Sequence, residues 1–200
     1  MTRKISLLVM MLVALLAAAC GGGAAGGGGG GGVTLSETYD SNGVTFKYPS
    51  GWVVDPNSST GVSIASAQAA LDALNAGSAA DVNLAAGQYA ISVLPFTGDE
   101  VQAMAVTDPK ALVSMMATGI TGGEASGITF GDAAEATING KPGARATGSN
   151  DKVDLQMVAI NMGDSGFAVV FAIAPKGEMG TLNNTFNPML DTLALTAAAG

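Results

Sequence analysis

The chain has 200 residues, with 8 basic and 16 acidic side chains, one cysteine and no histidine. The net charge of −8 argues against a nucleic-acid partner, because binding to phosphate backbones depends on clustered lysine and arginine. The missing histidine excludes Ser-His-Asp and Cys-His catalysis as usually built, and also imidazole metal sites. We therefore expect no catalytic residues, no metal and no cofactor.

The first 20 residues have the layout of an export signal. Arg3 and Lys4 supply positive charge, residues 5–16 are apolar apart from Ser6, and three alanines precede Cys20. A charged start, a short apolar run and small residues are typical of a secretory signal peptide. The apolar run is too short to span a bilayer, which takes roughly 20 apolar residues.

Residues 16–20, Leu-Ala-Ala-Ala-Cys, resemble the lipobox of bacterial lipoproteins. The resemblance implies that the Cys20 thiol receives a diacylglyceryl group and that the signal is cleaved between Ala19 and Cys20. The family most often has leucine at the position of Ala17, where alanine is tolerated. The implied location is extracytoplasmic, with the protein anchored to the membrane through lipid on Cys20. Gly21, in place of aspartate, favours the outer membrane where a cell has one.

An ordinary cleaved signal and a retained N-terminal helix are the alternatives to lipidation, but neither explains a lone cysteine at the end of the apolar run. Residues 21–32 contain only glycine and two alanines and predict a flexible tether. A phosphate-binding loop is not predicted there, because no Lys-Ser/Thr pair follows the glycines. The predicted organisation is a signal peptide over 1–19, the lipidated cysteine and tether over 20–36, and a globular domain over 37–200. Without residues 1–19, which carry two basic and no acidic residues, the side-chain charge is −10.

Alternating or β-branched runs in the globular domain predict strands, and apolar residues three or four apart predict helices. The predicted strands are 44–48, 52–54, 61–65, 88–94, 133–138, 144–148, 152–162 and 167–174. One helix is predicted over 66–75, and a second begins after Asp108 and ends at Gly119 and Gly122. We expect Pro95 to end the 88–94 strand.

A last helix is predicted from an apolar face of period 3.6, made of Met179, Leu182, Phe186, Met189, Leu190 and Leu193. Pro188 lies inside this pattern and predicts a kink or a restart of the helix near Asn187, because proline removes a hydrogen bond.

The run over 133–174 predicts an antiparallel meander, with glycine-containing loops at 139–143 and 163–166. The strand over 167–174 is apolar on both faces, which indicates that both of its faces are covered. In the strand before it, Asp154 and Gln156 share a face with apolar residues, so we expect that face to be covered in part. The predicted fold is α+β, an α/β/α sandwich with helices on both sides of a central antiparallel sheet.

Residues 44–52, Val-Thr-Phe-Lys-Tyr-Pro-Ser-Gly-Trp, resemble the opening of PsbP-like domains, where a strand leads through an aromatic-Pro-x-Gly-Trp turn into another strand. The later order of elements agrees over about residues 37–197. The resemblance implies the same sandwich and a non-catalytic docking or accessory role. Photosystem members of that family also use histidine in metal sites, which cannot be carried over to this chain.

The only tryptophan, Trp52, is the candidate contact for a protein partner, because tryptophan is enriched at interaction hot spots. Its alternative role is packing beside Pro49 at the edge of the sheet. Met115, Met179 and Met189 have the spacing of helix-core residues, so we prefer core packing to a copper(I) thioether site.

Acidic residues provide two further alternatives. Asp99, Glu100 and Asp108 could supply oxygen ligands to calcium, but no Asp-x-Asp-x-Asp-Gly loop supports such a site. A hydrolase that uses carboxylates alone needs two acids facing one cleft. Asp132 and Glu135 are three residues apart, which in a strand would place them on opposite faces.

The sequence favours a lipid-anchored, extracytoplasmic binding or accessory lipoprotein without catalytic activity. Its expected partners are the membrane, through the lipid on Cys20, and another protein, with no nucleic acid. The alternative is a lipoprotein that captures a small molecule or ion for a membrane complex, and the carboxylate hydrolase is the third hypothesis.

Overall fold

The computed structural model describes residues 33–56, 61–75, 82–122 and 127–196. The chain divides into two compact units, Met1–Gly31 and Gly32–Gly200, and all described residues belong to the second. The predicted signal peptide, its cleavage site and Cys20 lie outside the described residues. Across the described ranges, no helix combines the length and the apolar character that crossing a bilayer requires.

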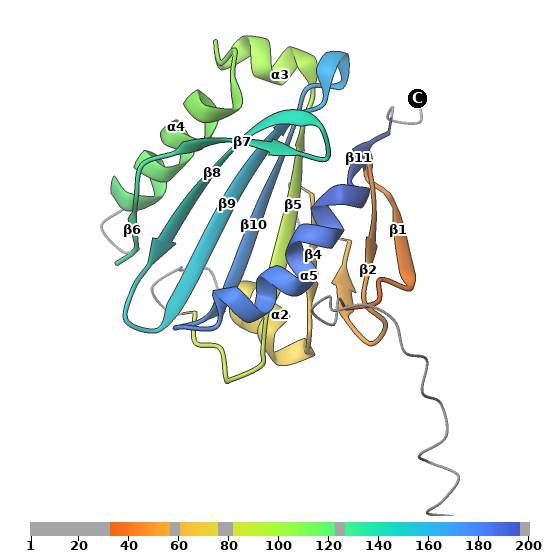
Figure 1. The fold of residues 1–200 in the computed structure, drawn as a ribbon, viewed down its shortest axis with the longest axis vertical. Helices are drawn as coiled ribbons and strands as arrows, with labels where there is room; N and C mark the ends of the chain where they lie inside the picture. Colours follow the sequence, from red (N-terminus) through yellow and green to blue (C-terminus); the bar gives the residue numbers. More distant parts are fainter. Residues whose placement is uncertain (1–32, 57–60, 76–81, 123–126, 197–200) are drawn as a thin grey trace, which may run out of the picture. The chain divides into compact units, whose positions relative to one another are not determined.

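The second unit is an α+β structure around a large antiparallel sheet (Figure 1). Eight strands of the described residues form it in the order β3-β4-β5-β10-β9-β8-β6, and β7 pairs with β8 beside β6. The strands are β3 Val53–Asp55, β4 Val62–Ala65, β5 Ala90–Phe96, β6 Thr129–Phe130, β7 Ala134–Ile138, β8 Lys141–Ser149, β9 Val153–Asn161 and β10 Phe167–Pro175. The predicted meander is confirmed, because β7, β8, β9 and β10 pair in sequence, each antiparallel to the next.

The turn between β7 and β8 is shorter than predicted. It consists of Asn139 and Gly140, which both have positive φ angles, of 47° and 74°. Asn-Gly favours this two-residue hairpin turn, whose twist matches that of the flanking strands. The predicted loop over 139–143 was therefore wrong, since Lys141 and the two residues after it already belong to β8.

The prediction that Pro95 ends its strand was also wrong. β5 continues through Pro95, which lies opposite Ala168 of β10. On the other side of β5, the pairing with β4 extends only as far as Val93. Beyond that residue one edge of β5 is open, and a proline is tolerated at an open edge because no ladder bond is lost there.

One face of the large sheet packs against helix α5, Met179–Thr192, and a second sheet (Figure 1). This second sheet has the order β1-β2-β11, with β1 Glu37–Ser41, β2 Val44–Tyr48 and β11 Ala194–Leu195. The helix runs without interruption through Pro188. As predicted, Met189 is fully buried, whereas Met179 is half-buried at the border of the same core.

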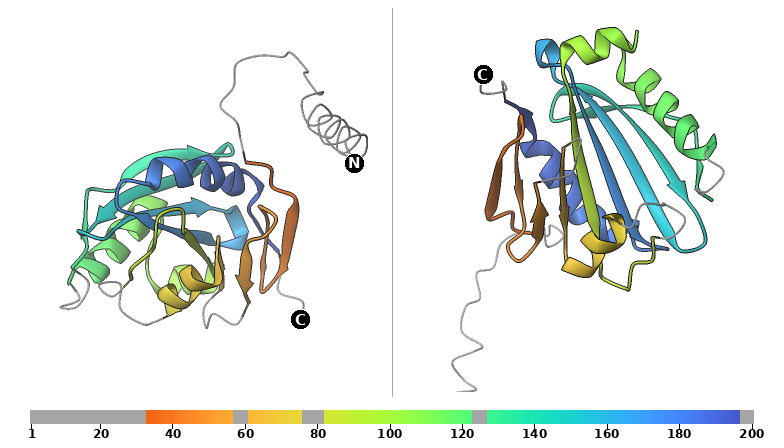
Figure 2. Two further views of the ribbon diagram at one scale, coloured as in Figure 1. Left: turned by 90° about the horizontal axis from the view of Figure 1, so that it is seen from below. Right: turned by 180° about the vertical axis from the view of Figure 1, so that it is seen from behind.

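The opposite face carries helices α2, Gln68–Asn75, and α4, Pro109–Gly122, which Figure 2 shows from behind. Helix α3, Gly98–Ala103, precedes α4, and a short 3-10 helix, Gly163–Ser165, joins β9 to β10. α4 continues past Gly119, so only Gly122 ends it as predicted.

The prediction that Met115 packs in the core was wrong, since 45% of this residue is exposed. Beyond Pro109, the buried residues of α4 among those described are Leu112, Val113 and Ala117. Successive helix residues are about 100° apart. Val113 and Ala117 therefore shift the centre of the buried stripe away from Met115, which projects to solvent.

Candidate functional site

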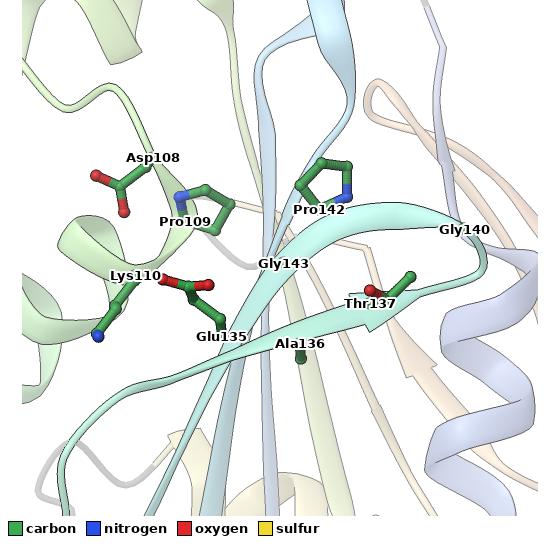
Figure 3. Close-up of a pocket in the computed structure, with 9 residues that line it drawn as sticks. All are labelled: Asp108, Pro109, Lys110, Glu135, Ala136, Thr137, Gly140, Pro142 and Gly143. Atoms are coloured by element: carbon green, nitrogen blue, oxygen red, sulfur yellow. The ribbon is translucent and has the colours of Figure 1, made fainter.

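A cleft of about 550 Å³ lies between the start of α4 and the β7–β8 hairpin (Figure 3). The residues around it come from these two parts of the chain and are mostly polar or small. They are Asp108, Pro109, Lys110, Glu135, Ala136, Thr137, Gly140, Pro142 and Gly143.

The α4 side of the cleft is organised by the start of the helix. The Asp108 carboxylate accepts a hydrogen bond from the Ala111 backbone N–H at 2.8 Å, and Pro109 is the first helical residue. This confirms the predicted N-cap and proline. The cap fixes the Asp108 carboxylate at the rim and places Lys110, whose side chain is exposed, beside it.

The opposite side comes from the hairpin. Glu135 and Thr137 are two residues apart on β7, so their side chains project from the same face of the strand, and Thr137 lies opposite Pro142 of β8. Figure 3 shows Glu135 pointing toward the α4 side of the cleft. The cleft thus presents two carboxylates and one ammonium group on an open, solvated surface, an arrangement suited to binding polar or charged groups.

A second hollow, of about 390 Å³, lies beside the later turns of α4. Its lining residues are Ser114, Ala117, Thr118, Thr121, Phe130, Gly131, Asp132 and Ala133. Because Lys110, Ser114 and Thr118 are spaced by four residues, one face of α4 borders both hollows. Asp132 lines this hollow and Glu135 the other, so the structure does not bring this carboxylate pair together in one cleft.

Two of the three acidic residues considered as calcium ligands, Glu100 and Asp108, cap helices. Glu100 accepts hydrogen bonds from the Thr97 backbone N–H at 2.7 Å and from the Thr97 hydroxyl at 3.0 Å, as part of the capping box that begins α3. Asp108 caps a different helix. Among the described residues, no group of three or more His, Cys, Asp or Glu side chains is placed to hold a metal ion.

Trp52 is half-buried and packs against the core on the α5 side of the sheet. Its backbone N–H donates to the Pro49 carbonyl oxygen at 3.4 Å, which closes the predicted turn at 49–51. The Trp52 side chain therefore has a packing role at the border of this core, and its contact with a protein partner stays a prediction.

Glu178 forms a polar contact that the sequence did not reveal. Its carboxylate accepts hydrogen bonds from the Tyr89 hydroxyl at 3.0 Å and from the Gly87 backbone N–H at 2.9 Å. Burial raises the pKa of Tyr89, and the bond to the Glu178 carboxylate raises this pKa further. No local pattern could predict this contact, because the two side chains are 89 residues apart.

No family model matches the chain, and no curated protein matches its sequence. Among solved structures, the chain is similar to LpqN, a protein involved in cell envelope biogenesis of Mycobacterium tuberculosis, with 18% identity over 77% of this chain and 83% of that one and a TM-score of 0.48. A Bacteroides thetaiotaomicron protein is 12% identical over 84% of this chain, at a TM-score of 0.43, and the match spans 51% of that protein. A Pseudomonas aeruginosa protein of unknown function is 9% identical over 81% of this chain and 98% of that one, with a TM-score of 0.38.

Proposed function

We propose that this protein is a lipid-anchored, extracytoplasmic accessory lipoprotein that binds another protein and has no catalytic activity of its own. The observation that carries the proposal is the order of parts along the chain. A lipobox-like Leu-Ala-Ala-Ala-Cys segment is followed by a glycine tract and then by one compact unit, Gly32–Gly200. Lipid on Cys20 would hold this unit near a membrane at the end of a flexible tether.

The α4 face is the part of the unit that fits a docking role. Its two adjoining hollows present hydroxyl groups and charges of both signs on the solvated surface. Mixed polar groups of this kind suit the rim of a protein interface, where they set orientation and specificity. The resemblance of residues 44–52 to the opening of PsbP-like domains also supports this proposal, because it implies a docking or accessory role.

The experiment combines lipid labelling and site-specific crosslinking in intact bacteria. Cells express the full chain with a photoreactive benzoylphenylalanine at Thr118, and they are fed an alkyne analogue of palmitate. We expect the protein to carry the alkyne label, to fractionate with membranes and to form one crosslinked adduct of defined mass. Cys20→Ser should lose both the label and the membrane association.

The matched control places the same photoreactive residue at Thr38, an exposed position on β1. The docking proposal expects the adduct from Thr118 and not from Thr38. An equal yield from both positions, or no adduct from Thr118, would contradict docking on the α4 face. An unlabelled wild-type chain in the soluble fraction would contradict the lipid anchor.

Capture of a small molecule is the second candidate function. It is favoured by two buried oxygen atoms that have no hydrogen-bond partner, one on Gln156 of β9 and one on Asn183 of α5.

A further inference from the structure

A polar strip lies where α5 passes the outer strands of the large sheet. Its side chains are Arg145 and Thr147 of β8, Gln156 of β9, and Asn183 and Asn187 of α5, and we call these five the Arg145 strip. An Arg145 Nη1 hydrogen bond to Asn187 Oδ1, at 2.9 Å, joins the strand to the helix. Asn183 is one helical turn before Asn187 and therefore lies on the same side of α5.

The strand register places the other members beside Arg145. Arg145 lies opposite Val158, and Thr147 lies opposite Gln156. Side chains alternate between the faces of a strand, so these four share one face of the sheet. Val158 belongs to the core beneath α5, which identifies that face as the α5 side. Gln156 is then the diagonal neighbour of Arg145, within reach of one small molecule.

Two members of the strip have a buried oxygen atom with no hydrogen-bond partner. Gln156 is 6% exposed, and its Oε1 atom is buried and unpartnered. Oδ1 of Asn183 is buried and unpartnered as well. A buried acceptor without a donor costs stability, and native structures pair nearly all such atoms with protein, water or ligand. These two oxygens therefore require hydrogen-bond donors.

Arg145 has the opposite property: it carries hydrogen-bond donors that no acceptor among the described residues uses. A guanidinium carries five N–H donors, and the bond to Asn187 uses one of them. No ion pair joins Arg145 to a carboxylate of the described residues; the negative charge of Asp191 acts on it from a greater distance. Burial lowers the pKa of Arg145, and the negative charge of Asp191 offsets this lowering only in part. The positive charge of the half-buried guanidinium is therefore only partly compensated by the protein. By contrast, Lys176 pairs directly with Asp154 at 2.9 Å.

We propose that the Arg145 strip is a binding site for a small anion that also carries hydroxyl groups, such as a polyol phosphate. Arg145 holds the phosphate with its free N–H donors, because a guanidinium matches two oxygens of such a group at once. The hydroxyls donate to the carbonyl oxygens of Gln156 and Asn183. The site lies on the opposite face of the sheet from α4 and depends neither on the lipid anchor nor on protein docking.

The test measures thermal unfolding of the protein as purified from cells in non-ionic detergent, followed by the fluorescence of Trp52. The probes are glycerol 3-phosphate, inorganic phosphate and glycerol, with sodium chloride holding the ionic strength constant. A ligand at ten times its Kd multiplies the folded-to-unfolded ratio by about 11. Glycerol 3-phosphate should give a saturable rise in Tm of about 4 °C at that concentration. Phosphate should act more weakly, and glycerol should have no effect.

Three variants assign the effect to the strip. Arg145→Gln should abolish the response to both phosphate compounds, while Lys47→Gln, which removes a charge from an exposed position on β2, should leave it intact. Gln156→Leu should unfold at a higher temperature without ligand and should lose the preference for glycerol 3-phosphate over phosphate. Asn187→Ala leaves the guanidinium in place without its partner and should weaken binding about fivefold.

The source of the anion is tested with dihexanoyl phosphatidylglycerol, which carries the same phosphate and hydroxyls on a lipid. A response at lower concentration than that to glycerol 3-phosphate would identify a lipid headgroup, and a weaker response would identify a free solute.

The proposal is overturned if Arg145→Gln responds like the wild type. It is also overturned if no probe gives a saturable response at concentrations up to 50 mM, in which case water alone satisfies the buried oxygens.

Discussion

The two faces of the large sheet are packed differently. On the α5 face, 19 buried apolar residues in the part of the chain that the structure describes form one continuous cluster, which includes Phe46 and Phe186. On the face that carries α2 and α4, the buried residues of the described ranges form two separate clusters of ten each. The cluster under α4 contains four alanines, and the two hollows described above border this helix. Large buried side chains therefore contribute most to stability on the α5 face, while the candidate docking surface lies on the face whose core has smaller side chains.

The largest expected effect is a difference in stability between the two faces. Phe186→Ala, on the α5 face, should lower the free energy of unfolding by about 4 kcal/mol, and Leu112→Ala, on the α4 face, by about 3 kcal/mol. Both residues are fully buried, but the phenyl ring leaves the larger cavity in a continuous core. Denaturant titration followed by Trp52 fluorescence measures both values. Met115→Ala, at an exposed position, is the control and should change stability by less than about 0.5 kcal/mol.

If Leu112→Ala cost as much as Phe186→Ala or more, the contrast between the two faces would be wrong.

A smaller effect is expected from the cap of α4. Asp108→Ala removes the acceptor for the Ala111 N–H and should destabilise the protein by about 1 kcal/mol. Asp132→Ala removes the same charge from an exposed position near the other hollow and should change stability by less than about 0.5 kcal/mol. Denaturant titration of the two variants at equal ionic strength measures the difference. Equal losses would mean that charge, and not capping, stabilises this end of the helix.

The smallest effect concerns pH and the contact that ties Tyr89 to the start of α5. The folded structure raises the pKa of Tyr89 above its ordinary value of 10. The contact therefore contributes its full stability below about pH 10 and loses it as the pH rises through the folded-state pKa. The Tm of the wild type should fall more steeply above pH 10 than that of Tyr89→Phe, which has no hydroxyl to titrate. Parallel curves for the two proteins would show that the raised pKa has no effect on stability.

Local patterns predicted most of the secondary structure. Runs of alternating, β-branched or continuously apolar residues identified the strands from β7 to β10, and the period of 3.6 identified α5, because these signals depend only on residues close together in the chain. The errors came from positions where a residue distant in sequence but close in space determines the extent of a strand or the burial of a side chain. Pro95 remains in β5 because β4 ends before reaching it, and Met115 is exposed because Val113 and Ala117 share the buried face of α4.

For the candidate sites, too, the sequence predicted the local features and missed those that depend on packing between distant elements. The sequence alone predicted the cap at Asp108, because capping depends on residues within one turn. It did not predict that Glu135 would share a cleft with that cap, since the two come from elements joined only by packing. The Arg145 strip was also missed. Gln156 was recognised as a polar residue on a partly covered face, but its burial beside α5 depends on how the helix crosses the sheet.

The sequence by itself determined the α+β class, the meander, the acidic charge and the lipobox-like segment, because each is a property of composition or of residues close together in the chain. Only the tertiary structure decided which polar groups meet. Arg145 and Asn187 are 42 residues apart, and Tyr89 and Glu178 are 89 apart. The packing of α5 across the sheet brings each pair into contact, and it arises from the whole core beneath the helix rather than from any local pattern.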